Sequence, residues 1–258
     1  MLEIIDVGSG PAVVLIPGIQ GRWEWMWPAV DALERHCRVI SFSLAESRGV
    51  DPTRGFDAYL DQIEEVMTRV GLGNAAVCGV SFGGLIALHW AARRPERTRA
   101  LVLVSTPSPN WKPAAHVDWY LRAPRLLAPV FAAQSPFRLG PEIWRAHDSV
   151  GDRLAFSGRH LARVARSPFS PVAMAERVRL MSTVDFEADC RRVRAPTLVL
   201  TGEPGLDRVV SVDSTRSYTD RIAGARHATL ERTGHIGLVT RPDQFAEMVG
   251  PFVMRSAA

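Results

Sequence analysis

Short runs of consecutive apolar residues recur along the chain and predict β-strands that are buried on both faces. Turn-forming residues separate these runs from the segments around them. The first two runs flank Gly8-Ser9-Gly10 and are expected to pair as a hairpin. The expected strands are Leu2–Val7, Ala12–Ile16, Arg38–Phe42, Ala75–Val80, Ala100–Ser105, Thr197–Thr201 and Ala228–Glu231.

Amphipathic segments between the runs predict helices. The clearest one, Phe56–Val70, places its apolar residues on one helical face, and Gly71 ends it. Because strands and helices alternate, we expect an α/β fold with a mainly parallel, doubly wound sheet. The other expected helices run from Pro28 to Arg35, from the residue after Ser81 to Arg94, and over Val212–Ile222 and Gln244–Val253.

The alternation stops between residues 107 and 185. Seven prolines interrupt the pattern between residues 107 and 141, and no clear strand is predicted in the whole segment. Several aromatic residues there favour helices, so we interpret residues 107–185 as a helical cap inserted into a core made of residues 1–106 and 186–258. The cap aromatics Trp111, Trp119, Tyr120, Phe137 and Trp144 together favour a small apolar or aromatic substrate.

Composition and charge exclude several classes of function. The 258 residues are 47% hydrophobic and 22% charged, as expected of a globular protein, and no apolar run is long enough to span a bilayer. A formal net charge of +4 does not favour nucleic-acid binding. The cap carries eleven basic and six acidic residues, which indicates either a solvated helical surface or a bias toward anionic substrates.

Cysteine usage and the N-terminal sequence predict a cytoplasmic protein. Cys37, Cys78 and Cys190 are odd in number and lack metal-type spacing, so we expect reduced thiols and neither a bound metal nor an organic cofactor. The first residues contain no basic segment followed by an apolar core, so no secretory signal is expected.

The sequence Gly79-Val80-Ser81-Phe82-Gly83 carries the strongest chemical indication. It joins an expected buried strand to an expected helix, where a sharp turn lifts one side chain out of the sheet and small neighbours let strand and helix approach each other. The N–H groups and dipole of that helix favour negative charge beside Ser81. We therefore predict that Ser81 is a nucleophile.

With this motif as its nucleophile elbow, the chain resembles the α/β-hydrolase superfamily over nearly its whole length, in the order oxyanion loop, nucleophile elbow, cap, acid loop and histidine loop. The resemblance is to small capped members, including enol-lactonases, C–C hydrolases and cofactor-free haloperoxidases. It implies the α/β-hydrolase fold and a Ser-His-Asp triad in the chain order serine, aspartate, histidine.

The resemblance also indicates the base and the acid. Gly234-His235, followed by Pro242-Asp243-Gln244-Phe245, is similar to the family's terminal G-H…P-x-x-F stretch, so His235 is the expected base. Asp207 occupies the place of the family's acid in the loop after Thr197–Thr201, and Glu203 is a weaker rival. A surface ion pair of Asp207 with Arg208 is the alternative role for this aspartate.

Acyl transfer also requires hydrogen-bond donors for a carbonyl oxygen that becomes negative. The expected donors are the backbone N–H groups of Phe82 and of Ile19. Many family members have His-Gly where this chain has Pro17-Gly18, but a backbone donor does not require that histidine. Trp23, Trp25 and Trp27 follow and either pack under the next helix or line the pocket mouth; Trp23, Trp25, Trp119 and Trp144 are the expected pocket residues.

These features predict a serine hydrolase that cleaves a small ester, lactone or related carbonyl substrate through an acyl-enzyme. Two alternatives use the same residues. One is a ligand-binding sensor on the same fold, and the other is a lyase in which Ser81 and His235 act as acid and base without an acyl intermediate.

Overall fold

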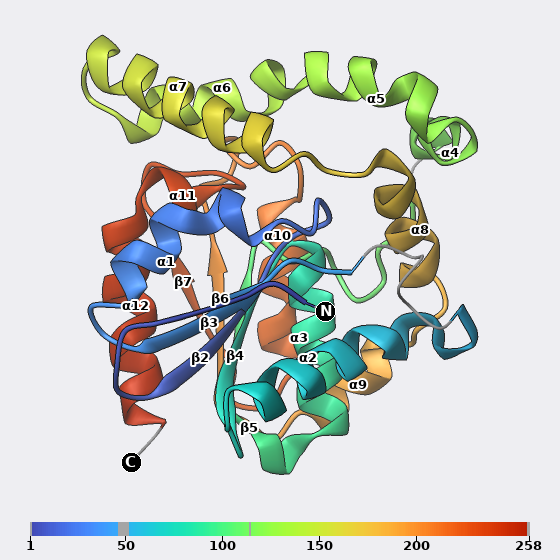
Figure 1. Cartoon of the computed structure of the whole chain (residues 1–258), viewed down its shortest axis with the longest axis vertical. Coiled ribbons are helices and arrows are strands. Elements are labelled where there is room, and N and C mark those ends of the chain that lie inside the picture. The colour runs from blue at the N-terminus through green and yellow to red at the C-terminus, as the bar shows by residue number, and fades with distance from the viewer. Residues whose placement is uncertain (1, 46–51, 114, 257–258) are drawn as a thin grey trace.

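A single, mostly parallel sheet organises the chain (Figure 1). The computed structural model describes residues 2–45, 52–113 and 115–256. Within these residues the sheet has seven strands in the order β1-β3-β2-β4-β5-β6-β7; β1 is antiparallel to β3 and every other neighbouring pair is parallel. The predicted fold class is thereby confirmed. The strands are β1 Ile4–Val7, β2 Ala12–Ile16, β3 Arg38–Phe42, β4 Ala75–Val80, β5 Thr98–Val104, β6 Thr197–Thr201 and β7 Arg226–Thr229.

The expected hairpin of the first two strands is wrong. Strand β3 lies between them, pairing Ile4 with Phe42 on one side and Ala12 with Arg38 on the other. The glycine turn reverses the chain but does not determine which strand becomes its neighbour. Strand β3 is almost wholly buried and fits an interior position, whereas β1 is only partly buried and forms the sheet edge.

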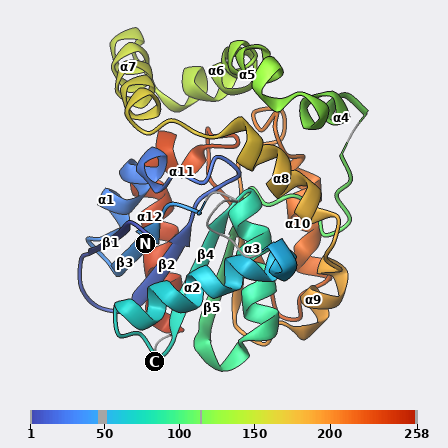
Figure 2. The ribbon, with the colours of Figure 1, turned by 45° about the vertical axis from the view of Figure 1, so that its right-hand side comes forward.

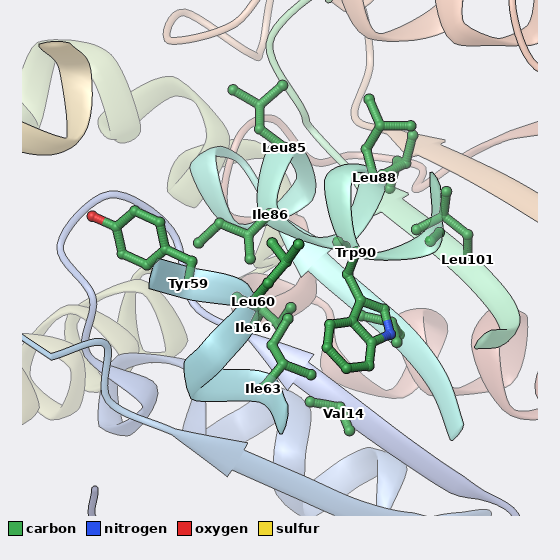
Figure 3. Close-up of a cluster of buried hydrophobic side chains, with 14 of the residues drawn as sticks. Val14, Ile16, Tyr59, Leu60, Ile63, Leu85, Ile86, Leu88, Trp90 and Leu101 are labelled. Atoms are coloured by element: carbon green, nitrogen blue, oxygen red, sulfur yellow. The ribbon is translucent and has the colours of Figure 1, made fainter. Parts of the chain in front are cut away.

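Helices cover both faces of the sheet, which explains why its strands are continuously apolar. Figure 2 shows α2, α3 and α9 on one side of the sheet and α1 and α12 on the other. Along β2, Val14 and Ile16 belong to the hydrophobic cluster beneath α2, α3 and α9 (Figure 3). Val13 and Leu15 belong to the cluster beneath α1 and α12. The helices of the core are α1 Trp27–Leu33, α2 Ala58–Arg69, α3 Phe82–Arg93, α9 Phe186–Arg192, α10 Val212–Arg216, α11 Gly237–Thr240 and α12 Pro242–Arg255.

Two of the expected helices are shorter in the structure, because one end of each expected range forms a 3-10 helix instead. The segment before α2 is the 3-10 helix η3, Pro52–Asp57, in which Gly55 departs from helical backbone angles. Helix α10 passes at Arg216 into η5, Ser217–Asp220. The remaining 3-10 helices of the described chain are η1 Trp23–Met26 and η4 Pro95–Arg97.

Between β5 and α9 the described chain contains five helices and no strand, as expected for residues 107–185. We call these five the cap helices. In Figure 1, α4 to α7 run across the top of the molecule, while α8 descends beside the sheet. We propose that residues 107–185 act as a cap. The cap helices are α4 Ala115–Arg122, α5 Pro124–Ala133, α6 Ser135–Ala146, α7 Val150–Arg166 and α8 Pro171–Met181.

A buried histidine of helix α3 contacts aspartates of two neighbouring elements. His89 is 1% exposed, and its Nδ1 lies 2.6 Å from Oδ2 of Asp189 in α9. Its Nε2 lies 2.7 Å from Oδ1 of Asp57 in η3. These contacts join three elements on one face of the sheet, and they fix the helix that begins directly after Ser81.

No helix among the described residues combines the length and the apolar character needed to cross a bilayer.

Glycines set how closely α3 can approach the sheet, and this approach can be tested. A Cβ atom at Gly84 would lie 2.7 Å from Cγ2 and 2.8 Å from Cβ of the buried Thr106. We expect Gly84→Ala to lower the free energy of unfolding by about 1–3 kcal/mol, because the added methyl group overpacks this contact. Thermal and urea unfolding measure the effect.

Gly158→Ala in α7 is the matched control, because nothing lies within 4 Å of its added Cβ. It should leave stability unchanged or raise it by up to about 1 kcal/mol, the helix preference of alanine over glycine. An unfolding curve for Gly84→Ala that coincides with that of wild type would contradict the close approach.

Candidate active site

Ser81 stands in a strained turn between β4 and α3. Strand β4 ends at Val80 and α3 begins at Phe82, so Ser81 alone makes the turn, with φ 53° and ψ −119°. A serine with positive φ costs about 1–3 kcal/mol and persists only where its surroundings impose it. Here the Ser81 N–H donates to the Val104 carbonyl at 2.8 Å, and a Cβ at Gly83 would lie 2.5 Å from the Ile16 carbonyl oxygen. The turn therefore holds the serine at the carboxyl edge of the sheet.

The loop after β2 lies against this serine. A Cβ at Gly18 would be 3.6 Å from Cβ of Ser81, and the Gly21 N–H closes a turn by donating to the Gly18 carbonyl at 2.8 Å. Ile19 is in that turn. Phe82 is the first residue of α3, where a backbone N–H has no partner within the helix. Both expected donors thus belong to segments that meet beside Ser81.

Asp207 and His235 come from the loops after β6 and β7 and contact each other. Nδ1 of His235 lies 3.1 Å from Oδ2 of Asp207. Oδ1 of Asp207 accepts hydrogen bonds from the backbone N–H groups of Val209 at 2.9 Å and Val210 at 2.8 Å. The two side chains are 12% and 2% exposed. The two backbone donors therefore hold the Asp207 carboxyl group in place through Oδ1, and Oδ2 is left to contact the His235 ring.

The same contacts determine the charge of Asp207 and the tautomer of His235. Burial by itself raises the pKa of Asp207, but the hydrogen bond with His235, the charge of His235 and the two backbone donors lower it below the ordinary 3.8. An ionised carboxylate can only accept hydrogen bonds, so Nδ1 of His235 carries the hydrogen. In the neutral ring, Nε2 is then the nitrogen that can accept a proton.

Close backbone contacts hold the two loops together. A Cβ at Gly234 would approach the Leu206 carbonyl carbon to 2.6 Å, and the Glu203 N–H donates to the Thr233 carbonyl at 2.8 Å. Glu203, the rival acid, accepts from the Arg232 N–H at 2.6 Å, whereas the described contact of the His235 ring with a carboxylate is made by Asp207. Arg208 donates to the Phe137 carbonyl at 3.2 Å and does not pair with Asp207.

The structure therefore brings together the predicted acid and base, and it brings the Gly18 loop to the predicted nucleophile. It does not join Ser81 to His235: among the described side chains, none is hydrogen-bonded to Oγ of Ser81. Catalytic hydrogen bonds are often long without a substrate, so the four segments still define one candidate site at the carboxyl edge of the sheet.

The four tryptophans expected in the pocket lie in different surroundings. Trp25 donates from Nε1 to the Ser167 carbonyl at 3.0 Å and packs edge-on against Phe169, so it joins η1 to the cap. Trp23 lines a surface groove of about 180 Å³ together with Trp27, Arg163 and Arg166. Trp119 and Trp144 are 72% and 63% exposed. A substrate role for the four remains a prediction.

Two buried charged residues beside the site were not predicted from the sequence. Glu142 of α6 is 0% exposed and Arg177 of α8 is 2% exposed. Glu142 accepts hydrogen bonds next to His235, and Arg177 donates one to the Ile19 carbonyl. Charged residues in amphipathic helices are normally solvated, so nothing in the pattern distinguished these two from their neighbours.

Within the described residues, no three His, Cys, Asp or Glu side chains are grouped so that they could hold a metal ion. The site groups a serine in a strained turn, a histidine paired with a buried aspartate, and the first backbone N–H of a helix, which are the groups predicted for acyl transfer.

Comparison with known proteins shows the family and the fold. The model of the alpha/beta hydrolase family matches residues 13–248. The chain is 28% identical to the pimeloyl–acyl-carrier-protein methyl ester esterase of Aeromonas salmonicida (strain A449), over 95% of this chain and 96% of that one. It is 27% identical to the 2-hydroxymuconate semialdehyde hydrolase of Pseudomonas sp. (strain CF600), over 97% of this chain and 86% of that one.

Among solved structures, the enol-lactonase from Burkholderia xenovorans LB400 superposes with a TM-score of 0.76 at 21% identity. The alignment covers 98% of this chain and 96% of the lactonase. At this identity the likeness concerns the fold.

The three cysteines lie outside the site, and their reactivity can be predicted. Burial raises the pKa of Cys37 to about 11 and that of Cys190 to about 12, and it also raises the pKa of Cys78. Because the thiolate is the reactive form, we expect no alkylation by iodoacetamide at pH 8 in the native protein and three adducts in denaturant. Intact mass spectrometry measures both, and rapid native alkylation would show that a thiol is accessible.

Proposed function

Since the chain belongs to the alpha/beta hydrolase family, we propose that it is a serine hydrolase that cleaves a small ester, lactone or related carbonyl substrate through an acyl-enzyme. The observation that carries the proposal is the pairing of His235 with an ionised, buried Asp207 at the edge of the sheet where Ser81 stands in its strained turn. If Ser81 had only a structural role in the turn, the site would not need a histidine oriented by a carboxylate, and it would not need that carboxylate to be buried.

Each group then has a defined role in acylation. Oγ of Ser81 forms a bond to the substrate carbonyl carbon while Nε2 of His235 takes the hydroxyl proton. As the tetrahedral intermediate collapses, its bond to the leaving oxygen breaks and His235 returns the proton to that oxygen. Asp207 keeps the ring in the required tautomer and stabilises its positive charge. Water, activated by the same histidine, releases the acid and regenerates Ser81.

The negative oxygen of the intermediate requires donors in fixed positions. We assign this role to the backbone N–H groups of Ile19 and Phe82, since both belong to segments next to Ser81. Donors held by a folded backbone need no reorganisation during the reaction, and removal of one such donor typically reduces kcat by a factor of about 10²–10³. The absence of a histidine before Gly18 does not affect a donor that belongs to the backbone.

The cap and the relatives indicate the substrate class. The relatives named above are a methyl ester esterase and a semialdehyde hydrolase, and the structural neighbour is an enol-lactonase, which supports an ester, lactone or related carbonyl compound as the substrate. The cap aromatics favour an apolar or aromatic acyl or alcohol group. Buried, unreactive thiols suit a reducing compartment, and we propose the cytoplasm.

The first test asks whether Ser81 is activated. We expect a fluorophosphonate to label wild type with one adduct per chain on Ser81, because the oxygen forms a bond to phosphorus as fluoride leaves. Ser81→Ala should give no adduct, and His235→Ala should label at least about 100-fold more slowly, as expected when a general base is lost. Intact and peptide mass spectrometry detect the adduct.

Failure of the folded wild-type protein to form this adduct would refute the serine hydrolase. The sensor and the lyase would then be the better interpretations. Labelling without turnover of any activated ester would favour the sensor, whereas turnover without an acyl-enzyme would favour the lyase.

The second test concerns the acid. We expect Asp207→Asn to reduce kcat for an activated ester such as p-nitrophenyl acetate by a factor of about 10²–10⁴, because an amide can hold the histidine in the wrong tautomer. Asp213→Asn is the matched control, because Asp213 is an exposed aspartate in the first turn of α10, after the same strand. It should retain the wild-type rate, and equal rates for both variants would remove Asp207 from the triad.

A further inference from the structure

Two cap side chains contact the backbone of the site from opposite sides. Glu142 and Arg177 lie on different cap helices, α6 and α8, and both are almost wholly buried. Burying a charged side chain is costly unless its hydrogen bonds are satisfied by the protein. The hydrogen-bond partners of these two residues therefore show which parts of the site they hold.

Glu142 holds the backbone next to His235. Its Oε2 accepts the Ile236 N–H at 3.0 Å, and its Oε1 accepts the Thr240 hydroxyl at 3.0 Å. Ile236 directly follows the histidine, and Thr240 ends the short helix α11 that comes next. A carboxyl group that binds both of them restricts the rotation of the peptide units that follow the ring.

Other contacts of the same cap helix reinforce this attachment. Arg232 donates from Nε to the Arg145 carbonyl at 3.0 Å, and Arg208 donates to the Phe137 carbonyl at 3.2 Å. Helix α6 is thus bound to the loop of the base and to the loop of the acid. Within α6, Glu142 is the buried side chain that makes such a contact next to the His235 ring.

Arg177 holds the loop that contains Ile19. Its Nη1 donates to the Ile19 carbonyl at 2.6 Å, and its Nη2 is 3.3 Å from the Leu44 carbonyl and 3.4 Å from that of Ala45. Gly21 makes room for the guanidinium, since a Cβ there would lie 2.6 Å from both terminal nitrogens. Because the Ile19 N–H and carbonyl belong to adjacent planar peptide units, fixing the carbonyl limits the directions in which the N–H can point.

We propose that Glu142 and Arg177 are positioning residues by which the cap holds the His235 loop and the Ile19 loop in their catalytic arrangement. The inference rests on the proposed serine hydrolase, in which His235 is the base and Ile19 supplies an oxyanion donor. The cap then completes the active site as well as covering it. Displacing α6 or α8 lowers the reactivity of Ser81 even toward a substrate too small to contact the cap.

The experiment measures saturable labelling of Ser81 by a small alkyl fluorophosphonate, which separates probe affinity from the limiting rate of labelling. Glu142→Met keeps the length of the side chain and removes both hydrogen-bond acceptors, and Arg177→Met keeps the length and removes the donors. We expect each variant to lower the limiting rate at least tenfold and to change probe affinity less than twofold. Arg177→Lys, which retains one cationic donor group, should lie between wild type and Arg177→Met.

Two controls separate positioning from general stability. Asp118→Asn and Arg122→Gln remove exposed charges of α4 in the same cap and should label at the wild-type rate. A tenfold loss of rate at temperatures well below the unfolding midpoint of each variant is not explained by lower stability. If a variant does not fold, amide exchange in wild type supplies the test: the Ile236 N–H should exchange slowly, as a donor to a buried carboxyl group does.

The outcomes distinguish the two proposals. A wild type that is not labelled refutes the serine hydrolase itself. A labelled wild type whose Glu142→Met and Arg177→Met variants react at the same limiting rate overturns the positioning role and leaves the hydrolase intact. A change in probe affinity alone would make both residues part of the binding surface, and this also overturns the positioning role. Rapid exchange of the Ile236 N–H would overturn the positioning role of Glu142.

Discussion

The close approach of α3 to the carboxyl ends of β2 and β4 is the constraint on which the rest of the site depends. It requires glycine at positions 79, 83 and 84, where a Cβ would overlap backbone or the buried Thr106. It also forces Ser81 into a backbone conformation that costs about 1–3 kcal/mol. The hydrophobic cluster beneath α2, α3 and α9 and the His89 contacts offset that strain by fixing α3 against the sheet. The strained serine and the placement of the Phe82 N–H at the start of α3 therefore result from the same close packing.

Most of this arrangement was predictable because its causes are local in sequence. An apolar strand, a glycine-flanked serine and a helix specify the turn at Ser81 within a dozen residues. The loops of Asp207 and His235 follow predicted strands, and the carboxyl ends of parallel strands lie at one edge of a sheet. Strand limits were accurate for β2, β3, β4 and β6, where buried apolar runs have sharp ends.

What the sequence did not predict depends on contacts between distant segments. The position of β1 beside β3 is decided by which strand can be buried, and the turn at Gly8 to Gly10 contains no information about that choice. Glu142 and Arg177 are separated from their partners by 94 and 158 residues. In their helices they share the spacing of solvated residues, and only the folded chain shows that their hydrogen-bonding groups face buried backbone.

The placement of these two residues bears on how one fold supports many reactions. In the proposed mechanism, strands and short loops of the core fix the nucleophile and bring acid to base, and side chains of the cap helices also restrain the direction of the histidine ring and of an oxyanion donor. An insertion that contributes such restraints cannot vary independently of the chemistry. Changes in the cap that alter substrate choice therefore also alter the geometry of the reacting groups, unless the hydrogen bonds of Glu142 and Arg177 are retained.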